Sequence, residues 1–341
     1  MPDLPPVTAR QVFIPLDLAS LPEPAGLGAT VRRLDGQTMG TRWSVAYVAS
    51  SPRHDDAVRA LAQRELDRVD AQMSTWKAGS DLCRFNAAGG NWQRLPDDFF
   101  TVLQAGLALA AATGGAYDPA CGALVDLWGF GPAPRRDTPP DAGEIDRARA
   151  AAGWARVRLD AATRSAWQAG GVRLDLSSIA KGHGVDLVSA ALQAAGFVHH
   201  LVEVGGELRG QGCKPDGTPW WVEFERPPPA GALPVALIAL HGLAVATSGD
   251  YRRAFAHAGR HYGHTIDPRS GWPVAHGLAA VSVVHSRCLQ ADALATALMV
   301  LGPQAGYAFA VQHGIAAAFV ERTASGDARE RLSPALAALL E

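Results

Sequence analysis

The chain has 341 residues, of which 48% are hydrophobic and 19% charged, and its 31 basic and 33 acidic side chains give a formal net charge of −2. This composition excludes collagen-like and intrinsically disordered chains. The balanced charge gives no electrostatic footprint for nucleic acid or for an anionic membrane. The four cysteines are far apart with no CxxC pair, so we expect buried free thiols rather than a disulfide scaffold or a zinc site.

The N-terminus carries early prolines and no apolar periodicity, so residues 1–30 are expected to form an extended arm. It lacks the basic region and unbroken apolar run of a secretory signal. No other uncharged apolar stretch has membrane-spanning length. We therefore expect no membrane span and a cytoplasmic location, or a periplasmic one if a leader is missing from the recorded sequence.

Hydrophobic patterning predicts a strand at residues 42–48 and helices at 55–73 and 97–113. Residues 131–143 (GPAPRRDTPPDAG) have the composition of a loop, and a short helix is expected after it. Further strands are predicted at residues 157–160, 171–176, 200–204, 220–225, 234–240 and 279–285. Helices are predicted at residues 179–195, 290–301 and 303–313, and a C-terminal one from residue 333.

Strands and helices are mixed without strict βαβ alternation. This pattern indicates an α+β fold with a mixed, mostly antiparallel sheet and packed helices. Signatures of common nucleotide-binding and hydrolase folds are missing: there is no GxxxxGK[ST], and the glycines of VGGELRGQG are not in GxGxxG order. Ser248 lies in ATSGDY rather than in a GxSxG elbow, which argues against a serine hydrolase.

Asp292 and Thr296 lie four residues apart in ADALATAL, on a predicted helix, and therefore share one face. A carboxylate and a hydroxyl together suit a hard cation such as Mg²⁺, which prefers oxygen ligands. The alternative is a solvated Asp and a Thr that bonds back to its own helix. On this segment alone the alternative is favoured.

The segment LDLSSIAKGHG leads from a strand ending at Asp175 into a helix, which places Ser178 near the helix N-terminus. Lys181, one turn inside, is unfavourable near the positive end of a helix unless an anion neutralises both, so it indicates a phosphate-bearing ligand. A surface lysine after a Ser cap is nearly as good an interpretation.

A third cluster is HTIDPRSG, in which Asp267 is suited to an Asx-type turn that fixes the backbone at His264. A histidine held in this way can act as a general base near neutral pH, although eleven histidines make a chance occurrence easy. Met39 and Trp76, beside glycines, are side chains that can enclose an aromatic ring system or serve as ordinary core residues.

Taken in order, these segments resemble the ApbE family, the FAD:protein FMN transferases, from about Thr38 to Gly302. The matching segments are MGTRW, MSTW with SDLCRFN, GAYDPACGALVDLWGFG, LDLSSIAKGHGVD, VEVGGELRGQG, ATSGDYRRAF, HTIDPRSGWPV and ADALATALMVLG. The resemblance implies an ApbE-like, T-fold-like architecture over residues 31–341, as a single domain or as two lobes with the FAD site between them.

It also implies an enzyme that binds FAD with Mg²⁺ and transfers FMN to a Thr or Ser hydroxyl of an acceptor protein, with release of AMP. By motif, His264 matches the candidate base and, with Asp292, the catalytic pair, while Asp292, Thr296 and the backbone carbonyl of Ser178 match the Mg²⁺ ligands. The positions that match the FAD site are Met39, Trp76, Ala116, Tyr117, Asp118, Asp175, Lys181 and Ile266. Two alternatives stay open: an FAD carrier or assembly factor without transfer, and a Mg²⁺-dependent FAD pyrophosphatase that yields FMN and AMP.

Overall fold

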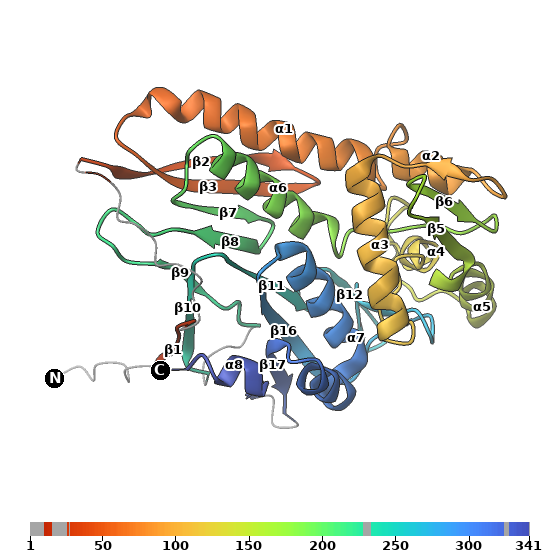
Figure 1. Ribbon diagram of the computed structural model, residues 1–341. Coiled ribbons are helices and arrows are strands. Elements are labelled where there is room, and N and C mark those ends of the chain that lie inside the picture. Colours follow the sequence, from red (N-terminus) through yellow and green to blue (C-terminus); the bar gives the residue numbers. More distant parts are fainter. Residues whose placement is uncertain (1–9, 16–25, 27, 228–232, 324–326, 341) are drawn as a thin grey trace.

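An eight-stranded sheet forms the centre of the computed structural model, which describes residues 10–15, 26, 28–227, 233–323 and 327–340 (Figure 1). Its strand order is β18-β17-β16-β11-β8-β7-β3-β2, and all neighbouring strands are antiparallel. The strands are β2 (Thr30–Thr38), β3 (Thr41–Ala49), β7 (His200–Val204), β8 (Glu207–Gln211), β11 (Leu243–Gly249), β16 (Leu278–His285), β17 (Ala316–Arg322) and β18 (Ala328–Leu332).

Three helices cover one face of this sheet, and a small second sheet covers the other. The helices are α1 (Asp55–Met73), α6 (Ala180–Ala194) and α7 (Cys288–Gln312), and the second sheet has the order β1 (Arg10–Phe13), β10 (Val235–Leu240), β9 (Trp220–Glu223). Alternation along β3 separates the two cores: Val45 packs with helices α1 and α6, whereas Ala46 packs with the second sheet.

A group of further elements gathers at one end of the molecule, at the right of Figure 1. They include α2 (Asp81–Ala87), α3 (Asp97–Ala112), α4 (Gly122–Leu127), α5 (Ala142–Ala151) and a sheet of β4 (Gln93–Arg94), β6 (Ser165–Gln168) and β5 (Val157–Asp160). Two hairpins, β12 (Ala254–His257) with β13 (Arg260–Gly263) and β14 (Ile266–Asp267) with β15 (Trp272–Pro273), complete the set. Short elements are η1 (Pro52–His54), η2 (Trp154–Arg156) and α8 (Pro334–Ala337).

The predicted α+β fold with a mostly antiparallel sheet is confirmed, as are most of the predicted elements. The two helices expected at 290–301 and 303–313 form α7, which is interrupted at Gly302, with φ +82°, just before Pro303. The helix expected from Ser333 is the single turn α8, capped by the Ser333 hydroxyl. Of the expected arm, Arg10–Phe13 pairs in parallel with β10, and residues 1–9, 16–25 and 27 lie outside the described residues.

The strand expected at 171–176 is wrong. This segment makes one isolated bridge, Cys121 with Arg173, and its other backbone groups bond to side chains and to a loop. The N–H of Leu174 donates to Asn86 Oδ1 at 2.8 Å, and the N–H of Asp175 donates to the Pro119 carbonyl at 2.8 Å. These local partners satisfy the backbone without a neighbouring strand.

Helix α7 alone, among the helices of the described ranges, combines membrane-spanning length with the required hydropathy. It contacts α6, β11 and β16, so most of its apolar surface lies against other elements of the fold. A helix that is buried in a protein core has the same apolar character as a span. The absence of a membrane span therefore stays a prediction.

A buried histidine in β7 predicts a pH-dependent stability. His200 is fully buried, its Nδ1–H donates to the Phe197 carbonyl at 2.7 Å, and its Nε2 accepts from the Ser189 hydroxyl at 2.8 Å. Burial lowers the pKa of His200 from 6.5 to about 4, so between these values only the unfolded state is protonated there and stability falls as the pH falls. In urea unfolding we expect wild type to lose about 2 kcal/mol more than His200→Gln between pH 7 and pH 5. Equal losses in the two proteins would contradict this assignment.

Candidate functional site

Asp292 and Thr296 lie on the first turns of α7, as the helical spacing predicts. The Asp292 side chain is 5% exposed, so the alternative of a solvated carboxylate is wrong. Its Oδ2 accepts the N–H of Gly182, in the first turn of α6, at 3.0 Å, and its Oδ1 lies 3.5 Å from Lys181 Nζ. Thr296 Oγ1 lies 3.0 Å from the Ser248 hydroxyl of β11. The junction of α6, α7 and β11 therefore holds a buried carboxylate and two half-buried hydroxyls beside an ammonium.

Gly182 allows α6 to approach α7 closely. A Cβ at this position would overlap the backbone carbonyl of Cys288 and come within 2.9 Å of Asp292 Cβ. Alanine normally favours a helix, but here the obstacle is backbone that cannot rotate away. We expect Gly182→Ala to lower the free energy of unfolding by about 1–3 kcal/mol.

The matched control for this prediction is Gly184→Ala in the same helix. The nearest atoms to a Cβ there are ends of side chains, of Leu66 at 3.0 Å, Met39 at 3.4 Å and Val69 at 4.0 Å, rather than backbone. Urea unfolding should show a smaller loss for Gly184→Ala than for Gly182→Ala. The reverse order would show that the α6–α7 approach is not the tight contact.

Lys181 is held by a second carboxylate that the sequence did not single out. Its Nζ lies 2.9 Å from Glu207 Oε1, and the Glu207 side chain, at the start of β8, is buried. Burial lowers the pKa of Lys181, but the charges of Asp292 and Glu207 outweigh it and hold that pKa above its usual value. Burial disfavours the charged form of Glu207 too, and for a carboxyl group this raises the pKa. Lys181 is therefore a cation at neutral pH.

The segments GAYDP and LDLSSIAKG are joined by hydrogen bonds: the Asp175 N–H donates to the Pro119 carbonyl at 2.8 Å, and the Ser178 hydroxyl donates to the Tyr117 hydroxyl oxygen at 3.1 Å. Ser178 lies two residues before α6 begins, as expected. Burial raises the pKa of Tyr117 well above its usual value, and the negative charge of Asp292 adds to that rise. Asp292 is thus close enough to Tyr117 for its charge to act on the phenol group.

Three other residues expected at the FAD site have clear structural tasks. Asp118 accepts the N–H of Ala120 at 2.7 Å and that of Trp154 at 3.0 Å, and its burial raises its pKa to about 6. Asp175 Oδ1 accepts the N–H of Ser177 at 2.8 Å, which forms a turn before α6 rather than a strand end. Ala116 is buried. These contacts fix the loops that surround Tyr117 and Ser178.

His264 directly follows β13, and its backbone N–H donates to the Arg253 carbonyl at 3.0 Å. Its Nδ1 lies 3.2 Å from the same carbonyl. Because a carbonyl only accepts, Nδ1 carries the proton, and Nε2 presents its lone pair. Burial and the charges of Arg253, Lys181 and Arg252 lower the pKa of His264 to about 4, so its imidazole is neutral at neutral pH.

The backbone around His264 is rigid on both sides. The predicted Asx-type turn is confirmed, since Asp267 Oδ1 accepts the N–H of Arg269 at 2.9 Å. Ile266, between them, is buried in an apolar cluster with Trp128 and Tyr262. The Tyr262 ring stacks on Phe255 with centroids 5.2 Å apart, which ties β13 to β12.

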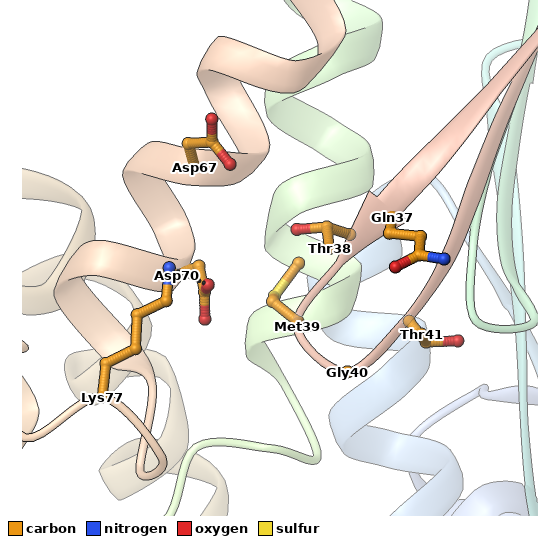
Figure 2. Close-up of a pocket in the computed structure, with 8 residues that line it drawn as sticks. All are labelled: Gln37, Thr38, Met39, Gly40, Thr41, Asp67, Asp70 and Lys77. Atoms are coloured by element: carbon orange, nitrogen blue, oxygen red, sulfur yellow. Dashed lines mark ion pairs between the residues drawn. The ribbon is translucent and has the colours of Figure 1, made fainter.

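Met39 lies at the tip of the β2–β3 hairpin, with φ +45°, beside a cavity of about 470 Å³. Figure 2 shows this tip facing Asp67 and Asp70 on α1, with Lys77 paired to Asp70 at 2.5 Å. Trp76, next to Lys77, is 63% exposed. Trp76 is therefore not a core residue, and its place at the FAD site stays a prediction.

No group of three His, Cys, Asp or Glu side chains that could hold a metal ion is present among the described residues. The donors at the α6–α7 junction are instead one carboxylate and one hydroxyl, from Asp292 and Thr296, and the Ser178 carbonyl stays the predicted third donor. These are all hard oxygen donors, and the carboxylate oxygen Oδ1 is not committed to a close hydrogen bond. The donor set fits Mg²⁺ better than a transition metal.

Comparison with known proteins places this chain in a family. The ApbE family profile matches residues 39–319. An FAD:protein FMN transferase from Vibrio cholerae is 37% identical over 295 residues, which cover 86% of this chain and 88% of the relative, and one from Haemophilus influenzae is 36% identical over 308 residues, which cover 86% and 87%.

The crystal structure of the apo form of the flavinyl transferase ApbE of Pseudomonas stutzeri superposes with a TM-score of 0.84 at 40% identity, covering 91% of this chain and 97% of that one. The flavin transferase ApbE from Vibrio cholerae superposes with a TM-score of 0.83 at 34% identity, covering 91% and 99%. The expected ApbE-like architecture is confirmed, and the chain belongs to the ApbE family.

Proposed function

We propose that this flavin transferase moves FMN from FAD onto a Thr or Ser hydroxyl of an acceptor flavoprotein, that it requires Mg²⁺ for the reaction, and that AMP leaves. The observation that carries the proposal is the buried junction of α6 and α7, where Asp292 lies 3.5 Å from Lys181. A diphosphate needs cationic groups around it, and Lys181 with the start of α6 supplies fixed positive potential.

In the proposed reaction the acceptor oxygen forms a bond to the FMN phosphorus while the bond from that phosphorus to the AMP oxygen breaks. Asp292, Thr296 and the Ser178 carbonyl would hold Mg²⁺, which when bound neutralises charge on the diphosphate and on the departing AMP. His264 would accept the hydroxyl proton at Nε2, the nitrogen that the Arg253 carbonyl leaves unprotonated.

The flavin part of FAD would lie toward the cavity beside Met39. Trp76 is exposed, precedes Lys77 of the cavity wall in the chain, and would offer an aromatic face for stacking. Tyr117, Asp118, Ala116 and Asp175 form the loops that connect this side to Lys181. Ile266 would close the opposite side from the His264 hairpin.

The test is to incubate the protein with FAD, Mg²⁺ and a candidate acceptor domain and to measure the acceptor by intact mass spectrometry. We expect the acceptor to gain one FMN on a Thr or Ser, AMP to appear in equal amount, and EDTA to abolish both. Free FMN and AMP without labelled acceptor would favour a pyrophosphatase. Bound FAD without turnover would favour a carrier.

The low pKa of His264 predicts an unusual acid limb in the pH profile. A histidine with an ordinary pKa of about 6.5 would lose its base function below that pH. Because burial and nearby cations lower the pKa of His264 to about 4, the neutral imidazole persists in mildly acidic solution. We expect kcat/KM, which reports the free enzyme, to stay nearly flat from pH 7 down to about pH 5. A midpoint near 6.5 would contradict this environment for His264.

A further inference from the structure

We propose that Glu207 is a positioning residue that holds the Lys181 ammonium away from Asp292, so that Asp292 Oδ1 stays available to a divalent cation. The inference rests on the proposed function, because it takes Asp292 as a Mg²⁺ ligand. It adds a role for a residue of β8 that does not itself have to touch FAD or the metal.

The geometry shows a competition between two carboxylates for one ammonium. Lys181 Nζ lies 2.9 Å from Glu207 Oε1, a full charge-assisted hydrogen bond, but 3.5 Å from Asp292 Oδ1, which is beyond a close one. Both carboxylates are buried, so neither attraction is strongly screened by water. Without Glu207, the same ammonium would pair closely with Asp292 and occupy the oxygen that a cation needs.

The fold fixes Glu207 for this task. It follows the Gly205–Gly206 turn, whose φ angles of +63° and +107° let β7 turn back directly into β8. Arg252 lies against this turn and donates to the Gly205 carbonyl at 2.7 Å, while Glu225 holds the same guanidinium. The position of Glu207 beside Lys181 is therefore fixed by a turn that Arg252 holds in place.

The second carboxylate oxygen of Glu207 supports the same interpretation. Oε2 is buried and has no hydrogen-bond partner among the described residues. An unpaired buried carboxylate oxygen is costly, so the contact of Oε1 with Lys181 is the main compensation that keeps this carboxylate in place. Glu207 and Lys181 form one unit, and Asp292 is left with the Gly182 N–H and a loosely placed ammonium.

The test is a double-mutant cycle read out as Mg²⁺ affinity, measured by calorimetric titration of Mg²⁺ into the FAD-saturated protein. We expect Glu207→Gln to weaken Mg²⁺ binding about tenfold, a typical coupling between residues in contact. Lys181→Met should bind Mg²⁺ at least as well as wild type, and adding Glu207→Gln to Lys181→Met should change the affinity by less than about threefold. An equal weakening in both backgrounds, or none in either, would overturn the proposal.

Glu207→Asp separates position from charge, because it keeps the negative charge on a side chain one methylene shorter. We expect it to weaken Mg²⁺ binding as Glu207→Gln does, whereas a mere charge effect would leave the affinity unchanged and overturn the proposal. Glu203→Gln is the matched control: Glu203, on β7, bonds to Ser44 and to the Gly206 N–H and should leave the affinity within about twofold of wild type. If wild type binds no Mg²⁺, or Asp292→Asn binds it as well as wild type, the metal assignment itself fails and the proposal falls with it.

Discussion

Asp292→Asn is expected to lower the rate of FMN transfer by about 10³-fold or more, because charge stabilisation by a metal contributes several kcal/mol to such a transition state. Asparagine keeps the shape of the side chain, and its amide oxygen can still accept the Gly182 N–H, now 3.0 Å from Oδ2. Alanine is the poorer test, since it leaves that buried N–H and Lys181 without their partner. The substitution to Asn therefore removes the proposed metal ligand with little effect on the fold.

The measurement is single-turnover transfer at saturating FAD and Mg²⁺, together with the thermal midpoint of each variant. Asp186→Asn is the control, because Asp186 also serves the α7 N-terminus: its oxygens accept the N–H groups of Cys288 at 2.9 Å and Leu289 at 3.0 Å. We expect Asp186→Asn to lower the thermal midpoint and to change transfer by less than about threefold, because it changes none of the residues proposed to act on FAD, Mg²⁺ or the acceptor. Undiminished transfer by Asp292→Asn would remove the metal assignment.

Local spacing predicted the half of the site that lies on α7 and α6. Asp292 and Thr296 share a helix face by the four-residue interval, and Ser178 lies just before a helix, as found, although the N-cap residue of α6 is Ile179, whose side chain makes no capping hydrogen bond. The partners that complete the site come from far along the chain. Glu207 lies 26 residues from Lys181, and Ser248 lies 48 residues from Thr296. Which strands become neighbours is set by sheet order, and no local pattern encodes that order.

Sheet strands were predicted best where their composition favours a strand. β3 and β16 contain several valines and were found, whereas β11 carries Ala, Thr, Ser and Gly, which signal a strand weakly. The error at residues 171–176 has the opposite cause. The segment VRLDL alternates like a strand, but Asn86 and Pro119 satisfy its backbone. Periodicity indicates which side chains are buried, and here it says nothing about what the backbone bonds to.

His264→Ala is expected to lower kcat for FMN transfer by about 10²-fold or more, the usual scale for loss of a general base. KM for FAD should change little, because the imidazole acts on the acceptor hydroxyl and not on the bound dinucleotide. The His264 backbone N–H donates to the Arg253 carbonyl, and the Asp267 turn follows it in the chain. Both of these contacts are made without the imidazole ring and remain in the alanine variant. A folded variant with a specific loss in kcat is therefore the expected outcome.

The exposed His261, on the neighbouring strand β13, gives the matched control, and His261→Ala should transfer FMN within about twofold of wild type. Added imidazole separates a proton-accepting role from a structural one. If His264 takes the hydroxyl proton, free imidazole should restore part of the kcat of His264→Ala in proportion to its neutral fraction, and should do nothing for Asp292→Asn. A loss of only a few fold in His264→Ala would mean that water or another group accepts the proton. A large loss that imidazole does not restore would assign His264 to holding the β12–β13 hairpin in place.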